Sequence, residues 1–391
     1  MYYTIPFTLF LFLIIGLIGC DNVSSVGGGP VSRGTENGDS EDWLIPVNQV
    51  IDGGPGKDGI PSIDNPQFIS VNEVPAYLQD NDLIVGVRIG DIVRAYPHPI
   101  LDWHEIVNDV IDNKAFSVTY CPLTGSAVTW NRTLTGRETT FGVSGLLYNS
   151  NLIAYDRATD SYWSQMMMQS VHGELIGDRA GLITIIETRW DTWKELYPES
   201  EILSTNTGFN RQYGNFPYGN YKTSNQLIFP VSNDDDRLHR KERVLGTIYR
   251  DHTDVVQKRD YFKSNSTTND RVQQYNLTTE TRVFQIDEFP DTIHTINDAY
   301  QDYPLVTVGS SKYNFAAAYE RSLRDGTLLE FKPVQNQLPI VMEDNEGTQW
   351  DIFGFAVNGP RAGAQLTQAN SYIAYWFAWA AFYPDAEIHL P

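Results

Sequence analysis

The stretch WDTWKELYPESEI (190–202) decides the fold, because it recurs without gaps as WFAWAAFYPDAEI (376–388). Both tryptophans, the Tyr-Pro pair and the final Glu-Ile match at a constant offset of 186 residues, which is 376 − 190. Self-similarity of this kind is typical of proteins built from repeated structural units. The stretch therefore predicts two copies of one unit.

Other pairs extend the match upstream in the same order along the chain. They are Leu83–Gly86 with Arg243–Gly246, Ala127–Arg132 with Ala316–Arg321, His172–Gly173 with Asn358–Gly359, and the segments ending at Trp163 and Trp350. Chance could produce one such pair but rarely several in one order. We predict a first copy over 61–204, a linker over 205–241 and a second copy over 242–391.

Most of each copy has the pattern of short strands separated by turns. Alternating stretches fall at 116–120, 127–130, 139–143 and 152–155, with turn residues between them. The spacing of apolar residues predicts a helix over 100–110 and a second, shorter one over 192–197, which Pro198 ends. The expected fold is mainly β, a β-rich α+β fold of two tandem antiparallel β-meander units with few short helices.

The N-terminus predicts export and lipid anchoring. An apolar, uncharged run from Ile5 to Gly19 suits the core of a signal peptide over residues 1–20. It ends in Leu17-Ile18-Gly19-Cys20, which resembles the lipobox of bacterial lipoproteins and implies cleavage before a diacylated Cys20. Residues 21–60 begin as a Gly, Ser and acid-rich stretch and are expected to form a disordered tether. We expect the protein in the cell envelope, anchored to a bacterial membrane and facing the periplasm or exterior.

The charge balance excludes one class of partner. The chain has 28 Lys and Arg against 49 Asp and Glu, a net charge of −21, which argues against binding nucleic acid. It does not identify a ligand. Besides the membrane, a protein partner remains open.

Cys121 is the main candidate for chemistry in the mature chain. It stands in TYCPLTGSA (119–127), where a strand is expected to end and Pro122 to begin a tight turn. A cysteine at such a junction is often partly exposed, and Cys20, if lipidated, is no disulfide partner. Three interpretations stay open: a buried small hydrophobe, a soft-metal ligand, or a redox or nucleophilic thiol.

Three histidines of the first copy are the candidate companions of Cys121 in a metal site. His98 lies between two prolines, which favours an extended loop; His104 lies on the apolar face of the expected helix; His172 precedes Gly173 at a turn. Thiolate with imidazole suits copper before zinc. His98 is the first choice, since a core histidine is the more frequent outcome for His104 and an anchoring hydrogen bond would explain His172.

The motifs together resemble one family. AYP…HEIVND, VTYCPLTGSAVTWNR, FGVSGLLYNSNLIAYDRATDSYWSQ and WDTWKELYPE are similar to the bacterial and archaeal DUF3179 family, over roughly 61–391. The resemblance implies an exported protein of unassigned function. Some relatives have Cys-Pro-Leu-Cys, where this chain has Thr124, so a two-cysteine clip is not expected.

Two hypotheses follow. In the first, the anchored protein has a copper or thiol site around Cys121, with His98, His104 or His172. In the second, it is a noncatalytic β scaffold for a protein or envelope partner, with Cys121 buried and structural. At the position aligned with Cys121 the second copy has Ser310, so the first copy is where a site is expected.

Overall fold

The computed structural model describes residues 43–74, 76–250, 279–300 and 303–391. The predicted signal peptide, Cys20 and residues 21–42 of the predicted tether lie outside the described residues. The tether prediction is wrong for residues 43–60, because Trp43 and Ile45 are buried and Val50–Asp52 forms a strand. Within those residues, no helix has both the length and the apolar character needed to cross a membrane.

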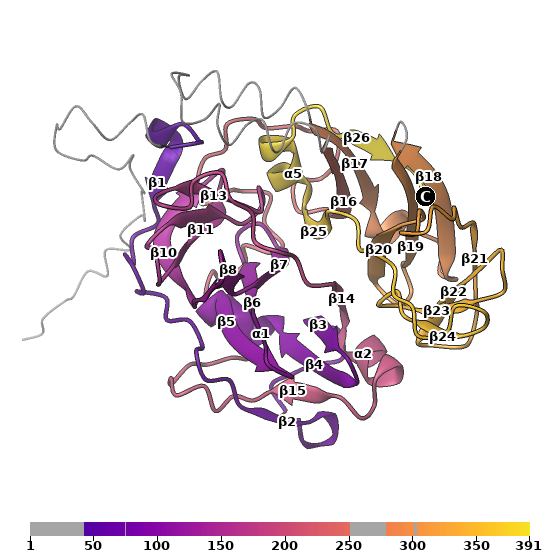
Figure 1. The fold of residues 1–391 in the computed structure, drawn as a ribbon. Helices are drawn as coiled ribbons and strands as arrows, with labels where there is room; N and C mark the ends of the chain where they lie inside the picture. The colour runs from indigo at the N-terminus through magenta and orange to yellow at the C-terminus, as the bar shows by residue number, and fades with distance from the viewer. Residues whose placement is uncertain (1–42, 75, 251–278, 301–302) are drawn as a thin grey trace, which may run out of the picture.

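The first half contains three main sheets (Figure 1). In the order of pairing, they are β14 (Ile185–Arg189), β3 (Leu83–Ile89), β4 (Ile92–Pro97), β15 (Glu201–Leu203) and β2 (Phe68–Ser70); then β5 (Ile106–Ile111), β6 (Lys114–Cys121) and β7 (Ser126–Asn131); then β1 (Val50–Asp52), β10 (Phe141–Tyr148), β11 (Asn151–Asp156), β12 (Tyr162–Ser164) and β13 (Gln169–His172). A small hairpin joins β8 (Thr133–Leu134) to β9 (Arg137–Glu138). The helices are α1 (His98–His104) and α2 (Trp190–Leu196), with short 3₁₀ turns at Val47–Gln49 and Val71–Glu73.

The second half has the same three kinds of sheet. They are β25 (Ser371–Tyr375), β16 (Arg243–Arg250), β17 (Thr279–Gln285) and β26 (Glu387–His389); then β18 (His294–Tyr300), β19 (Tyr303–Ser310) and β20 (Phe315–Glu320); then β21 (Phe331–Pro333), β22 (Ile340–Asp344), β23 (Gln349–Asp351) and β24 (Ala356–Asn358). Its helix is α5 (Trp376–Phe382), and a 3₁₀ turn spans Ile286–Glu288. The predicted β-rich fold of antiparallel meanders is confirmed.

The two halves share their pairing scheme. In the first sheet of each, β14 and β25 pair antiparallel with β3 and β16, whereas β15 and β26 pair parallel with β4 and β17. The helices α2 and α5 begin at Trp190 and Trp376, the first residues of the repeated stretch. A common origin of the two halves by duplication stays a prediction.

A glycine in each half marks the same close contact. A Cβ on Gly86 of β3 would lie 2.1 Å from the ring of Trp193, and a Cβ on Gly246 of β16 would lie 2.1 Å from the ring of Trp379. Both indoles are fully buried. Each helix thus lies so close to its sheet that the strand beneath the tryptophan has room only for glycine.

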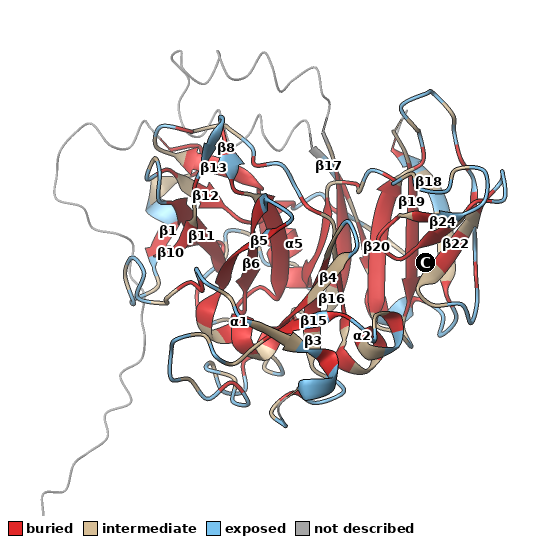
Figure 2. Ribbon diagram, turned by 60° about the horizontal axis from the view of Figure 1, so that its bottom comes forward, coloured by how far each residue is buried: buried red, intermediate tan, exposed pale blue. Residues whose placement is uncertain are grey.

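Each helix packs on the sheet of its own half and also contacts the other half. Trp193 of α2 packs edge-on against Phe353 of the second half, with ring centroids 6.3 Å apart, and Phe382 of α5 packs edge-on against Tyr148 of the first half, 5.3 Å apart. Strand β25 also contacts β7, and β14 contacts β20. These shared contacts bury the strands where the halves meet (Figure 2), so each core depends on residues of the other half.

One predicted element is wrong in part. The helix expected over 100–110 is α1, which ends at His104, and Ile106–Ile111 forms strand β5 instead. Glu105 adopts the left-handed conformation, with φ of 56°, and its backbone N–H closes the last turn on Leu101. The β-branched residues that follow then pair with β6, an example of tertiary pairing that overrides an apparent helical period.

Candidate functional site

His98 is the first residue of α1 and not part of an extended loop, as its two flanking prolines suggested. Pro97 caps the helix and Pro99 lies in its first turn, where proline is tolerated because no backbone N–H is needed. The His98 ring is 3 % exposed and lies against the ring of Tyr120, with centroids 4.3 Å apart. The helix start therefore fixes this imidazole in a buried position.

A carboxylate and a guanidinium lie behind His98. Its Nε2 is 3.3 Å from Oε2 of Glu187 on β14, which is within ion-pair reach but out of line for a hydrogen bond. The other oxygen of Glu187 accepts a hydrogen bond from Arg243 of the second half, which also donates to Asn314. No hydrogen bond of His98 Nδ1 is found among the described residues.

Arg243 and His98 keep Glu187 in its ionised form. Burial would raise the pKa of its carboxyl, but Arg243 and then His98 outweigh burial and hold the pKa below its ordinary value of 4.5. A carboxylate facing Nε2 would repel a lone pair there, so the proton of a neutral His98 belongs on Nε2. In that tautomer, Nδ1 carries the lone pair of the ring.

A cavity of about 170 Å³ opens beside His98 at the junction of the halves. Its lining residues are Asn81, Asp82, Leu83, His98, Pro99, Tyr120, Gly125, Lys222, Arg243 and Tyr375. Among the described residues, no hydrogen bond of the Tyr120 or Tyr375 hydroxyl is found. Burial raises the pKa of both tyrosines, so their hydroxyls stay protonated at neutral pH.

The predicted linker forms one wall of this site. Lys222 donates a hydrogen bond of 2.8 Å to Oδ2 of Asp102 on α1, while the backbone of Asn215 accepts a hydrogen bond from Trp103. The other oxygen of Asp102, Oδ1, is buried without a hydrogen-bond partner among the described residues. Burial raises the pKa of Asp102, although Lys222 opposes the shift. The linker is thus a part of the site and not only a connection.

Behind Tyr375 lies another amine, which is buried. Lys241 is 7 % exposed, its Nζ lies 3.2 Å from the centre of the Tyr221 ring, and it has no hydrogen-bond partner among the described residues. Burial, and next the charge of Arg240, lower the pKa of Lys241 to about 7. Because this amine does not line the cavity, we assign it no role in the site.

Cys121 ends strand β6 where the sequence predicts a strand to end, but it is buried and not partly exposed. Its Sγ donates a weak hydrogen bond of 3.7 Å to the Ser150 carbonyl. Burial, and next the Glu105 carboxyl, raise the pKa of the Cys121 thiol to about 11. Glu105 itself is buried, which raises its pKa to about 8. These surroundings favour the neutral thiol over the reactive thiolate.

Cys121 is therefore expected to resist alkylation in the folded protein. With a Cys20→Ser chain, we expect maleimide to react with Cys121 at least about 100-fold more slowly than with an exposed cysteine, because little thiolate forms at pH 7 and the sulfur is covered. Asn225→Cys on the exposed linker is the matched control. Mass spectrometry of the labelled protein measures both rates. A rate for Cys121 within about tenfold of the control would contradict its burial.

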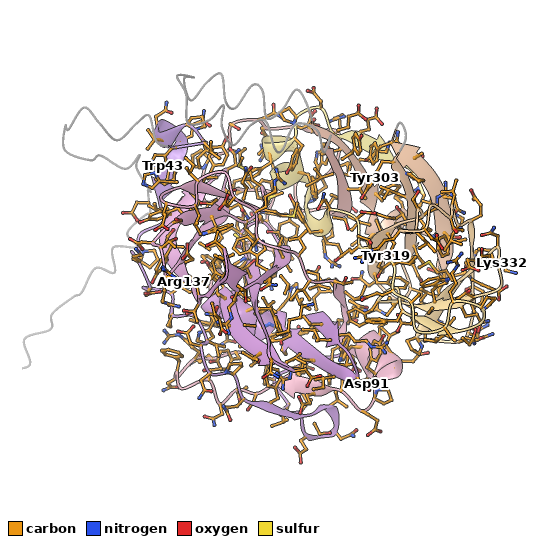
Figure 3. All side chains as sticks on the ribbon, viewed as in Figure 1. Trp43, Asp91, Arg137, Tyr303, Tyr319 and Lys332 are labelled. Carbon is orange, nitrogen blue, oxygen red and sulfur yellow. The ribbon has the colours of Figure 1, made fainter. Side chains whose placement is uncertain are left out.

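The other two histidines lie in different surroundings. His104 Nδ1 lies 2.8 Å from the Pro61 carbonyl and its Nε2 lies 2.9 Å from the Tyr213 hydroxyl, so both ring nitrogens have partners. Burial lowers the pKa of His104. His172, at the end of β13, stacks on Trp43 with centroids 4.4 Å apart. Trp43 is labelled at the top of the first half in Figure 3, well away from α1 in Figure 1.

The residues present do not fit the copper or zinc site expected from Cys121, His98, His104 and His172. Within the part of the chain that the structure describes, no three His, Cys, Asp or Glu side chains are grouped as metal ligands would be. The nitrogens of His104 are already paired, and Cys121 favours its neutral form, whereas a metal needs the thiolate. We derive no step through a metal.

The sequence missed the partners that make His98 notable. Glu187 and Tyr375 lie on strands that the sequence treats as framework, and Arg243 belongs to the second copy. One signal was available, since Glu187 is an acid between apolar and β-branched residues in Ile185–Arg189. Nothing local connects that strand with His98, so the site is formed by both halves and not by the first alone.

Comparison with known proteins gives one match. A family model described as "Protein of unknown function (DUF3179)" matches residues 57–386, most of the chain. Neither the curated proteins nor the solved structures give a match.

Proposed function

The chain belongs to the DUF3179 family of proteins of unknown function, and we propose that its junction site transfers a proton to or from a small molecule bound beside His98. The observation that carries this proposal is the buried His98–Glu187 pair at the edge of a cavity. A carboxylate behind an imidazole fixes the tautomer and balances the charge that the ring gains when it accepts a proton.

The chemistry follows from this arrangement. Nδ1 of His98 takes a proton from an O–H or an activated C–H of the bound molecule, and Glu187 stabilises the imidazolium that forms. Arg243 keeps Glu187 ionised and oriented, so it acts as a positioning residue. The hydroxyls of Tyr120 and Tyr375 can donate to an oxygen on which negative charge develops.

Export and anchoring belong to the same proposal. From the sequence, we propose that Cys20 carries a lipid that holds the protein on a bacterial membrane, with the folded part facing the periplasm or exterior. Changing Cys20 to alanine should move the protein from the membrane fraction to the soluble fraction. For Cys121, the burial favours the structural interpretation of the scaffold hypothesis, and we assign the thiol no catalytic role.

Crystals soaked with a mixture of small alcohols, amides and carboxylic acids test the proposed site. We expect one of these molecules in the cavity, with a polar atom within hydrogen-bond distance of His98 Nδ1. The matched control is a His98→Phe crystal, in which the ring remains but the nitrogens are lost. Molecules bound only elsewhere, or bound equally in the His98→Phe crystal, would contradict the proposal.

A further inference from the structure

The lining of the junction cavity is rich in positive charge and in hydrogen-bond donors. Lys222 and Arg243 both line it, and Asp82 is the single acid among its lining residues. The carboxylates that pair with the two cations, Asp102 and Glu187, are not lining residues and are 4 % and 3 % exposed. The cations therefore present their free donors to the cavity while their counter-charges lie behind them.

The donors outnumber the acceptors that the protein supplies. The Lys222 ammonium has three N–H groups, of which one is given to Asp102. The hydroxyls of Tyr120 and Tyr375 add two donors without partners among the described residues. Oδ2 of Asp82 already accepts a hydrogen bond of 2.7 Å from the backbone of Gln79. The lining side chains thus offer more donors than acceptors, and an anionic oxygen would supply further acceptors.

Resting on the proposed function, we propose that the molecule bound at the junction is a small carboxylate of about six non-hydrogen atoms. Its ionised group binds between Lys222, Arg243 and the two tyrosine hydroxyls. Its carbon chain lies against the apolar part of the lining, Leu83 and Pro99.

The volume of the cavity and the chemistry of its lining both fit a small carboxylate. A cavity of about 150 Å³ holds benzene, which has six non-hydrogen atoms, and the junction cavity has a volume of about 170 Å³. Inorganic phosphate would leave Leu83 and Pro99 without an apolar partner. A neutral molecule would supply no negative charge to Lys222 and Arg243 on the side that faces the cavity. The small carboxylate satisfies both parts of the lining.

The buried acid behind Lys222 makes this residue the more responsive of the two cations. Oδ1 of Asp102 has no hydrogen-bond partner among the described residues, and burial raises the pKa of that carboxyl. The charge of Lys222 is therefore less fully compensated than that of Arg243, whose partner Glu187 is held in the ionised form. Lys222 is accordingly the residue to change.

A titration with isobutyrate, watched through the NMR signals of the His98 ring, tests the proposal. Isobutyrate has six non-hydrogen atoms, and isobutyramide has the same shape without the charge. We expect isobutyrate to bind with a dissociation constant of about 1–10 mM, the range open to so small a ligand. Isobutyramide and inorganic phosphate are expected to bind at least about tenfold more weakly.

Variants assign the effect to Lys222. Lys222→Met should weaken isobutyrate at least about tenfold, Lys222→Arg should stay within about threefold of the wild type, and Lys312→Met, at an exposed site, should have no effect. Equal binding of isobutyramide, tighter binding of phosphate, an unchanged Lys222→Met variant or no binding at all would each overturn the proposal. None of these results alters the tautomer of His98, on which the proposed proton transfer depends, so the two failures are distinguishable.

Discussion

Gly86→Ala is expected to lower the free energy of unfolding by about 3 kcal/mol or more. The new methyl group would lie 2.1 Å from Cζ3 of Trp193, far closer than two non-bonded carbon atoms can approach. Trp193 is fully buried between its own sheet and the second half, so it cannot move aside without disturbing the core that the halves share. Overpacking of this kind costs at the upper end of the usual range.

Thermal or denaturant unfolding of the variant measures this loss, and a double-mutant cycle identifies its cause. The atoms nearest the new methyl belong to the six-membered ring of the indole, so Trp193→Phe should relieve the clash. We expect the double variant to be more stable than the sum of the single losses predicts, by at least about 1 kcal/mol. Gly181→Ala, whose nearest neighbour is 3.7 Å away, is the control. If the losses of the two single variants simply added in the double variant, the contact between the new methyl and Trp193 would not be the cause of the instability.

The corresponding change in the second half, Gly246→Ala, is expected to cost about the same. Its methyl would lie 2.1 Å from Trp379 of α5. Because the halves share their cores, either variant should lower the whole unfolding transition rather than unfold one half first. Separate transitions in calorimetry would contradict a core shared by the two halves.

Glu187→Leu is expected to lower the free energy of unfolding by about 3 kcal/mol at pH 7. The change leaves Arg243 without its buried counter-charge and His98 Nε2 without a charged neighbour. Leucine keeps most of the volume, so packing contributes little. Glu187→Gln, which can still accept a hydrogen bond from Arg243, should lose about half as much. Glu195→Gln on the exposed side of α2 should change stability by less than about 0.5 kcal/mol.

Removing Glu187 and Arg243 together is expected to cost less stability than removing Glu187 alone. Replacing Glu187 by leucine together with Arg243 by methionine removes both charges, so the double variant should regain at least about 1 kcal/mol over Glu187→Leu alone. Equal stability of the single and double variants would mean that Arg243 does not depend on Glu187.

The Glu187 carboxylate also makes the free energy of unfolding depend on pH in a defined direction. Because the pKa of Glu187 is lowered in the folded protein, its contribution is present above the unfolded pKa of about 4.3 and is lost as the pH falls through the folded value. The difference between wild type and Glu187→Leu should therefore shrink below about pH 4. A difference that grows on acidification would contradict an ionised Glu187.

The repeated stretch was the most informative part of the sequence for the fold. It placed α2 and α5 at corresponding points, and the strand patterns around Phe116 and Ala127 correspond to β6 and β7. The helix expected beyond His104 was wrong, because a left-handed Glu105 and pairing with β6 outweigh the apolar period. A local sequence pattern does not predict which strands pair in the folded protein.

The site was predicted only in part, for the same reason. The sequence marks His98 as unusual through its two prolines, and it marks Cys121 through the rarity of cysteine. It does not connect His98 with Glu187, 89 residues later (187 − 98), or with Arg243 in the other half. Cys121 is buried in a cluster that includes Tyr221 and Phe229 of the linker, and no local sequence pattern predicts that these residues meet.

The tautomer of His98, read from the NMR signals of its ring nitrogens in ¹⁵N-labelled protein, tests the central claim most directly. His104 is an internal reference, because its Nδ1 donates to the Pro61 carbonyl and its Nε2 accepts from Tyr213. The site described above predicts the opposite state for neutral His98, with the proton on Nε2 facing Glu187 and Nδ1 free, and loss of that preference in Glu187→Leu. A proton on Nδ1 of His98 in the wild type, or a tautomer unchanged by Glu187→Leu, would contradict it.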